Sequence, residues 1–133
     1  MKLTRRYRFS AAHRLDSPAL TSEENRTLYG KCNNPYGHGH DYVLDVTVDG
    51  WPDESGQIVA REPLDELVRE RVLHRFDHRN LNADIAELAG VVPTTENLTV
   101  VIGKALAEGW TMPAKLDRVR VSETERNIFE MEL

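Results

Sequence analysis

Residues 41–50, DYVLDVTVDG, alternate between apolar and mostly polar side chains along their whole length. Tyr42, Leu44, Val46 and Val48 fall on one face of an extended chain. Because successive side chains of a strand point to opposite faces, this period of two predicts a half-buried β-strand. Such a strand needs a second layer to cover its apolar face.

The N-terminal segment, residues 2–11 (KLTRRYRFSA), shows the same period. Leu3, Tyr7, Phe9 and Ala11 share one side, with polar side chains opposite, so a second half-buried strand is expected here. Two more strands are expected at the end of the chain, in residues 116–123 (LDRVRVSE) and 128–133 (IFEMEL), joined by the tight turn TERN.

Between these strand pairs the period changes to that of a helix. The first predicted helix starts near Pro63, which suits a first turn, and its inward face comprises Leu64, Leu67, Val68, Val72 and Phe76. The second lies within residues 91–110, where Thr94 or Thr95 can cap the N-terminus and Gly109 ends the helix. Its inward face comprises Leu98, Val101, Ile102, Ala105 and Leu106.

The element order ββααββ predicts an α+β domain: an antiparallel four-stranded sheet with two helices on one face. The 133 residues suit a single domain, 1–133. An uncovered sheet face and free strand edges favour assembly with other copies. Residues 15–37 show no periodicity, and a long irregular segment inside a compact domain is usually functional.

Composition excludes several classes of function. A net charge of −5 argues against general affinity for nucleic acid. The single cysteine cannot form an internal disulfide, and no run approaches the ~18 apolar residues of a membrane span. A soluble, cytoplasmic protein is expected.

Histidines are the first candidates for chemistry. His38 and His40 lie two residues apart on an extended segment, so both imidazoles face the same side. His13 ends the first predicted strand, and antiparallel pairing would bring it beside them; three histidines with an open fourth position are typical of catalytic zinc. An exposed histidine pair is the plainer interpretation, and His74 with His78 is a rival metal pair if the first helix continues.

Cys32 has two functional interpretations beside that of a small buried residue. It is either a fourth ligand closing a structural zinc site, or a base beside an open one. Its polar loop and the neighbouring Lys31 favour a thiolate. Asp77 and His78 form a carboxylate–imidazole pair that can transfer protons, or alternatively a helix-end cap.

Five segments together resemble the 6-pyruvoyl-tetrahydropterin synthase family, in the family's order and over nearly the whole chain. They are FSAAHRL (9–15), GKCNNPYGHGH (30–40), FDHRNLN (76–82), PTTENL (93–98) and SETERN (122–127). The resemblance implies the tunnelling fold, with subunits that build barrels and assemble as a homohexamer of two trimers. It also implies that zinc is bound by His13, His38 and His40.

The resemblance further assigns the substrate and the remaining site residues. It implies that Cys32, Asp77 and His78 form the proton-transfer set, with Cys32 as the base. Glu123 matches the carboxylate that anchors the pterin ring, with Glu125 as a nearby competitor. The substrate-pocket loop is matched by Thr94, Thr95 and Glu96.

The expected substrate is 7,8-dihydroneopterin triphosphate, with a magnesium ion accompanying the triphosphate. Family members that form 6-carboxy-tetrahydropterin typically have three residues between the cysteine and HGH, whereas this chain has the five residues NNPYG. The pyruvoyl-forming branch is therefore favoured over the carboxy-forming or side-chain-cleaving activity. A zinc hydrolase and a non-enzymatic zinc module remain as distant alternatives. Four cationic residues near these motifs are candidates for binding the triphosphate: Arg14, Arg26, Lys31 and Arg79.

Overall fold

The computed structural model describes all 133 residues of the chain. In chain order its elements are β1 (Lys2–His13), α1 (Ser22–Tyr29), η1 (Gly30–Asn33), β2 (His38–Asp49), α2 (Arg61–Val68), η2 (Arg69–Leu73), α3 (His74–Phe76), β3 (Arg79–Asn80), η3 (Ala86–Leu88), α4 (Thr95–Ala107), β4 (Lys115–Ser122) and β5 (Ile128–Glu132). The predicted α+β class is confirmed. No helix combines the length and the apolar character that crossing a membrane requires.

One sheet contains all five strands, in the order β3-β1-β2-β4-β5. The four long strands are antiparallel, as predicted. The prediction of four strands was incomplete, because β3 pairs in parallel with Ala11–Ala12 of β1 and makes the sheet mixed. A strand of two residues is too short to show an alternating pattern, so the sequence carries no periodic signal for it.

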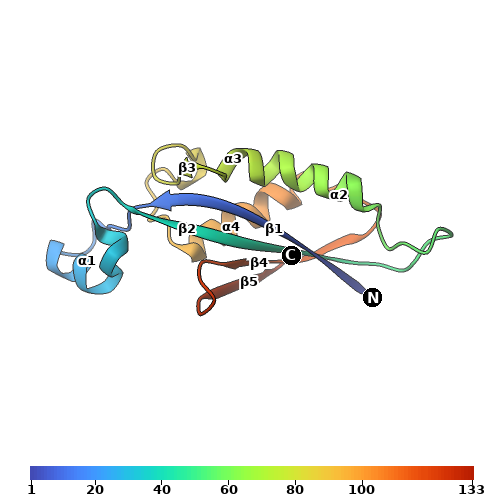
Figure 1. Ribbon diagram of the computed structural model, residues 1–133, viewed down its shortest axis with the longest axis horizontal. Coiled ribbons are helices and arrows are strands. Elements are labelled where there is room, and N and C mark those ends of the chain that lie inside the picture. The colour runs from blue at the N-terminus through green and yellow to red at the C-terminus, as the bar shows by residue number, and fades with distance from the viewer.

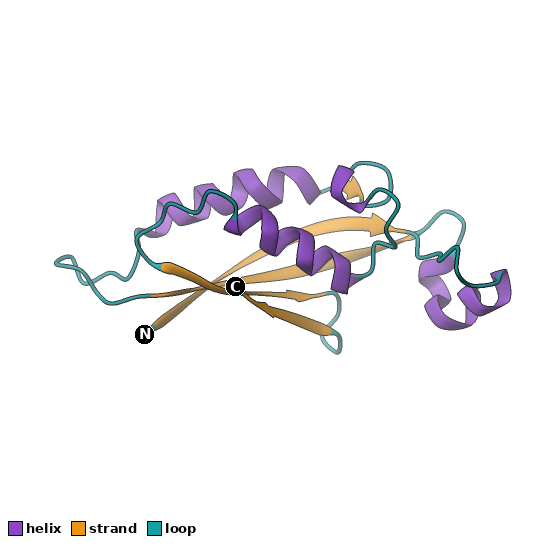
Figure 2. Ribbon diagram, turned by 180° about the vertical axis from the view of Figure 1, so that it is seen from behind, coloured by secondary structure: helices purple, strands orange, loops and turns teal.

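Both predicted helices cover the same face of the sheet, as Figures 1 and 2 show. The first runs from Arg61 to Phe76 without a break in its path, through α2, the π-helical turn η2 and α3. Arg71, on the π-helical turn, donates to the Leu106 carbonyl at 2.9 Å and so caps the last turn of α4. This contact fastens the two covering helices to each other.

A third helix, α1, lies in the segment that was predicted to be irregular, and it projects from the end of the sheet where β1 finishes (Figure 1). It begins with a capping box, in which the Thr21 hydroxyl accepts from the Glu24 amide and the Glu24 carboxylate accepts from the Thr21 amide. Only Asn25 of this helix is buried. The helix therefore lacks the apolar stripe from which a helix is predicted in sequence, which is why this segment was expected to be irregular.

The core lies between the helices and the sheet. On β2 the four predicted inward residues, Tyr42, Leu44, Val46 and Val48, are completely buried. Phe9 pairs with Tyr42 across the strands, and their rings stack with centroids 5.1 Å apart. Each such side chain contributes roughly 1.5–3 kcal/mol to folding through its burial. The sheet is thus closely packed where it leads into the histidines.

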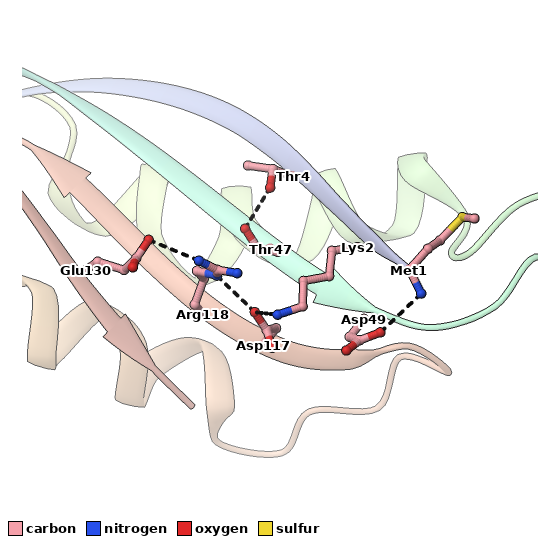
Figure 3. A network of polar contacts seen from close by, with 8 residues as sticks. All are labelled: Met1, Lys2, Thr4, Thr47, Asp49, Asp117, Arg118 and Glu130. Carbon is pink, nitrogen blue, oxygen red and sulfur yellow. Dashed lines mark hydrogen bonds and ion pairs between the residues drawn. The ribbon is translucent and has the colours of Figure 1, made fainter.

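The helix-free face of the sheet is polar. Figure 3 shows part of it, where Lys2 reaches Asp117 at 3.1 Å and the Thr4 and Thr47 hydroxyls meet at 2.8 Å. Deeper on the same face Arg6 forms two hydrogen bonds with the buried Asp45, at 2.8 and 3.0 Å. This face is therefore stabilised by ion pairs and hydrogen bonds instead of by an apolar layer.

Candidate metal and substrate site

The histidines lie at the end of the sheet's helix-covered face. In the antiparallel register His13 pairs with His38, and His40 pairs with Ala11. His13 follows the buried residues of β1 at period two, and His40 precedes those of β2 at the same period, so the core face itself leads into the site. The predicted juxtaposition of the three histidines on one face is confirmed.

His13 is oriented by a contact from another part of the chain. Its Nδ1 lies 2.9 Å from the Pro93 carbonyl oxygen and donates to it, since a carbonyl can only accept. The Nε2 atom then carries the lone pair. It is buried and has no hydrogen-bond partner. A buried, unsatisfied nitrogen is costly unless something binds it, and a metal ion would do so.

Three donor atoms converge near His13. The ligand atoms of His13, Cys32 and His40 all lie within 4.8 Å of one another. The Cys32 Sγ to His40 Nε2 distance is 3.6 Å, close to the roughly 3.5 Å that separates a sulfur and a nitrogen bound to one tetrahedral zinc ion. The donor set therefore fits zinc.

His38 shares this face with His13 and His40 but is not one of the three converging donors. It is exposed, and its ring packs edge-on against that of His40 with centroids 4.8 Å apart, but it is outside the converging trio. The structure thus places Cys32 where the sequence prediction placed His38. His13 and His40 are common to both donor sets, and the identity of the third ligand stays a prediction.

Burial controls the protonation of the trio. It lowers the pKa of both His13 and His40, which favours the neutral imidazoles that bind metals. Burial, followed by the negative charge of Glu123, raises the pKa of the Cys32 thiol. The expectation that Lys31 would favour the thiolate was wrong, because Lys31 is exposed and the nearby charge that acts on the thiol is negative.

Glu123 belongs to the same site. Its Oε2 accepts a hydrogen bond from the hydroxyl of the buried Thr95, and its Oε1 lies 3.6 Å from His40 Nε2. The side chain is only 16% exposed. The sequence pointed to both residues, but only the fold brings the start of α4 against the end of β4.

The other predicted pocket residues have different positions. Thr94 is the N-cap of α4, and its hydroxyl accepts from the Asn97 amide at 3.3 Å. Glu96, in the first turn of the helix, is exposed, and so is Glu125. Of the residues predicted to form the substrate loop and the pterin anchor, only Thr95 and Glu123 therefore lie beside the donor trio.

Asp77 and His78 lie at the edge of the sheet. His78 Nδ1 is 3.1 Å from Asp77 Oδ2, so the predicted pair is formed. The backbone is pinned to β1, because His78 N donates to the Ser10 carbonyl at 2.6 Å and Ser10 N donates to Asp77 at 2.8 Å. His78 and His40 line one cavity of about 380 Å³. His78 itself is 82% exposed.

The rival metal pair does not form. α3 ends at Phe76, and His78 has a positive φ of 58°, so His74 and His78 are not one helical turn apart. His74 lies in a separate cavity with Asp84.

Tyr42 is a site residue that the sequence did not reveal. Its hydroxyl lies 3.5 Å from His13 Nδ1, and its ring is 5.7 Å from that of His40. Its place in an apolar alternation marked it only as a core residue. The single available signal was its position two residues after His40, on the same face.

Known proteins resemble this chain over nearly its full length. The 6-pyruvoyl tetrahydropterin synthase family matches residues 2–133. The 6-pyruvoyl tetrahydrobiopterin synthase of Poecilia reticulata is 45% identical over 128 residues, which cover 95% of this chain and 86% of that protein. That of Homo sapiens is 43% identical over 129 residues, which cover 96% and 88%. The structure of Caenorhabditis elegans 6-pyruvoyl tetrahydropterin synthase has a TM-score of 0.91 and 36% identity, covering 100% of this chain and 95% of that one.

Proposed function

The chain belongs to the 6-pyruvoyl tetrahydropterin synthase family, and from this membership we propose that it is a lyase that converts 7,8-dihydroneopterin triphosphate to 6-pyruvoyl-tetrahydropterin and triphosphate. The observation that carries the proposal is the convergence of two imidazoles, a thiol and a carboxylate at one end of the sheet. The relatives that bear this name are similar over nearly all of the chain. The reaction needs no external oxidant. Two side-chain carbons are oxidised from alcohols to carbonyls, and these electrons reduce the pterin ring and the third side-chain carbon, which becomes a methyl group as triphosphate leaves.

A zinc ion would be held by His13 and His40 together with either His38 or Cys32. The orphaned Nε2 of His13 supports this assignment. When bound, zinc supplies Lewis acidity that makes the protons of the substrate's side-chain diol easier to remove. We propose that a magnesium ion accompanies the triphosphate.

Glu123 would anchor the pterin ring. A pterin presents its N2 amine and N3–H side by side, and a carboxylate can accept both hydrogens, as it does from arginine. The Thr95 hydroxyl holds one carboxylate oxygen and thereby fixes its orientation. Thr94 contributes by capping α4, which sets the position of Thr95, and Glu96 would reach the substrate from the exposed side of the first helical turn.

Proton transfer would be divided between Cys32 and His78. The Cys32 sulfur takes the proton from a side-chain carbon, and its raised pKa makes it a strong base once it is ionised. His78 exchanges a proton with a side-chain oxygen through Nε2, since its Nδ1 faces Asp77. Asp77 orients this imidazole and stabilises its charged form.

We propose that the protein assembles as a homohexamer in the cytoplasm, with barrels formed by association of the sheets. The polar helix-free face and the 82% exposure of His78 support pockets that a neighbouring copy completes. Light scattering should give a mass near six times that of the 15.2 kDa chain. A stable, active monomer would contradict this proposal.

Mass spectrometry of the product tests the function directly. The protein is incubated with 7,8-dihydroneopterin triphosphate, and we expect 6-pyruvoyl-tetrahydropterin together with free inorganic triphosphate. A 6-carboxy product would instead place the chain in the carboxy-forming branch, which the five residues between Cys32 and HGH argue against.

A further inference from the structure

A polar cavity of about 270 Å³ lies between α1 and the loop that leads into β2. Its lining includes Arg14, Arg26, Ser22 and Asn34, and it contains no aliphatic or aromatic side chain other than Pro35. None of the histidines, Cys32, Thr95 or Glu123 lines it. A cavity with this lining suits a strongly hydrated, charged group and does not suit a pterin ring.

The charge of this cavity is unbalanced in favour of cations. Arg14 Nε is buried and has no hydrogen-bond partner. The nearest carboxylate, Asp16, lies 3.6 Å from Arg14 Nη2, beyond ordinary hydrogen-bond length, and the same oxygen already accepts from Asn33 at 3.0 Å. Arg26 forms no ion pair. Two guanidinium groups are thus balanced by only one carboxylate. The buried Arg14 Nε–H lacks an acceptor, which a ligand oxygen would supply.

The cavity adjoins the loop that carries the thiol. Gly30 and Asn33, which flank Cys32, contribute to its lining. Leu15 N donates to the Cys32 carbonyl at 2.7 Å, so the residue after Arg14 is fastened to this loop. The backbone of Arg14 is held by Asn82, which accepts from its amide at 2.7 Å and donates to its carbonyl at 2.8 Å. Arg14 is therefore positioned by rigid neighbours between a metal ligand, His13, and the thiol loop.

We propose that this cavity, through Arg14 and Arg26, binds the triphosphate chain of the substrate. The inference rests on the proposed function, because it takes the substrate to be a pterin that carries a triphosphate. Guanidinium groups match phosphate oxygens in a bidentate geometry, while Ser22 and Asn34 supply neutral donors. The substrate would then be held at both ends, by the carboxylate of Glu123 at the ring and by the two arginines at the phosphates.

Inorganic tripolyphosphate is the probe for this site. It is titrated by calorimetry into the zinc-loaded wild type and into Arg26→Gln and Arg14→Gln. Each substitution should weaken binding at least about tenfold, the effect of losing a charge-assisted hydrogen bond. Binding of phosphate-free 7,8-dihydroneopterin should stay unchanged. Arg26 is exposed on α1, so Arg26→Gln tests the site with little risk to folding.

Two further variants make the result specific. Arg61 is an exposed arginine on α2, so Arg61→Gln is the matched control. Any heat that arises because the probe chelates zinc should be the same in this control as in the cavity variants, and can be subtracted. Arg79→Gln tests the rival arginine, which lines the cavity of His40 and His78. If Arg79→Gln weakens tripolyphosphate binding and both cavity variants bind like wild type, the proposal is overturned.

Kinetics separate this inference from the proposed function. Arg26→Gln should raise the KM for dihydroneopterin triphosphate with little change in kcat. If the wild type forms product and the cavity variants keep its KM, the cavity assignment fails while the function stands. If the cavity variants lose tripolyphosphate but the wild type forms no product, the anion site stands while the proposed function fails.

Discussion

Replacing Glu123 with glutamine should weaken pterin binding while leaving the metal site intact. The Glu123 carboxylate has one oxygen engaged by the Thr95 hydroxyl, while the other lies 3.6 Å from His40 Nε2, too far for a hydrogen bond. That second oxygen and the remaining lone pairs are available to a ligand. Glutamine has nearly the same shape, but it carries no charge and presents an N–H₂ group in place of one acceptor.

The magnitude follows from the bonds that are lost. A hydrogen bond to a charged group contributes about 1.5–3 kcal/mol. The side chain is only 16% exposed, so water replaces the lost acceptor poorly. At about 1.4 kcal/mol per factor of ten, Glu123→Gln should weaken pterin binding about 10- to 150-fold.

The assay is a binding titration with a non-reacting, phosphate-free pterin, accompanied by measurement of zinc content and oligomeric mass. Glu125→Gln is the matched control, since Glu125 is an exposed carboxylate in the adjacent turn. An independent readout comes from Cys32, whose pKa the Glu123 charge raises. Removing that charge should lower the thiol pKa and speed its alkylation at a given pH. If Glu125→Gln is the damaging change and Glu123→Gln is silent, the anchor assignment is wrong.

Cys32→Ala should lose lyase turnover yet retain one zinc per chain; loss of zinc from this variant would instead support the thiol as a structural ligand. Gly37→Ala should reduce the free energy of unfolding by about 1–3 kcal/mol, because φ is +80° and a Cβ would lie 2.8 Å from the His13 carbonyl oxygen. If urea unfolding shows that this variant is as stable as wild type, the argument is refuted. The Arg5 hydrogen bond holds the pKa of Asp65 below its usual range, so its contribution to stability is present above about pH 4, the ordinary pKa of aspartate, and is lost as the pH falls through the lower folded-state pKa. Urea unfolding is measured between pH 6 and pH 2, roughly the range over which the carboxyl titrates. The free energy of unfolding should fall less steeply with decreasing pH in Asp65→Asn than in wild type. Equal slopes of this free energy against pH would rule this account out.

Elements that depend on local periodicity could be predicted from the sequence alone. The alternation in residues 41–50 and 2–11 indicated which side chains of the two central strands face the helices. The structure buries most of these residues in the core, while Leu3 and Tyr7 are partly buried against it. The same period of two determined that His38 and His40 share a face, and antiparallel pairing then placed His13 opposite them. These features need only the pleat of a strand and the pitch of a helix, so they can be predicted from neighbouring residues.

Local pattern failed where an element was short or lacked an apolar face. β3 has two residues, and α1 buries only Asn25. The capping box of Thr21 and Glu24 was present in the sequence, but without an apolar stripe behind it no helix was predicted. Hydrogen bonds stabilise these elements, and hydrogen bonds leave a weaker trace in sequence than burial does.

The way in which the site residues meet depends on contacts that form only in the folded domain. The Pro93 carbonyl fixes which nitrogen of His13 is free, although the two residues are 80 positions apart. Thr95 meets Glu123 because α4 starts beside the end of β4, and Cys32 reaches His40 because Leu15 holds its loop. The first two contacts join segments that are distant in the chain, so their geometry depends on the packing of the whole domain. The raised pKa of Cys32 has the same origin, since burial and the carboxylate of Glu123 exist around the thiol only after the chain has folded.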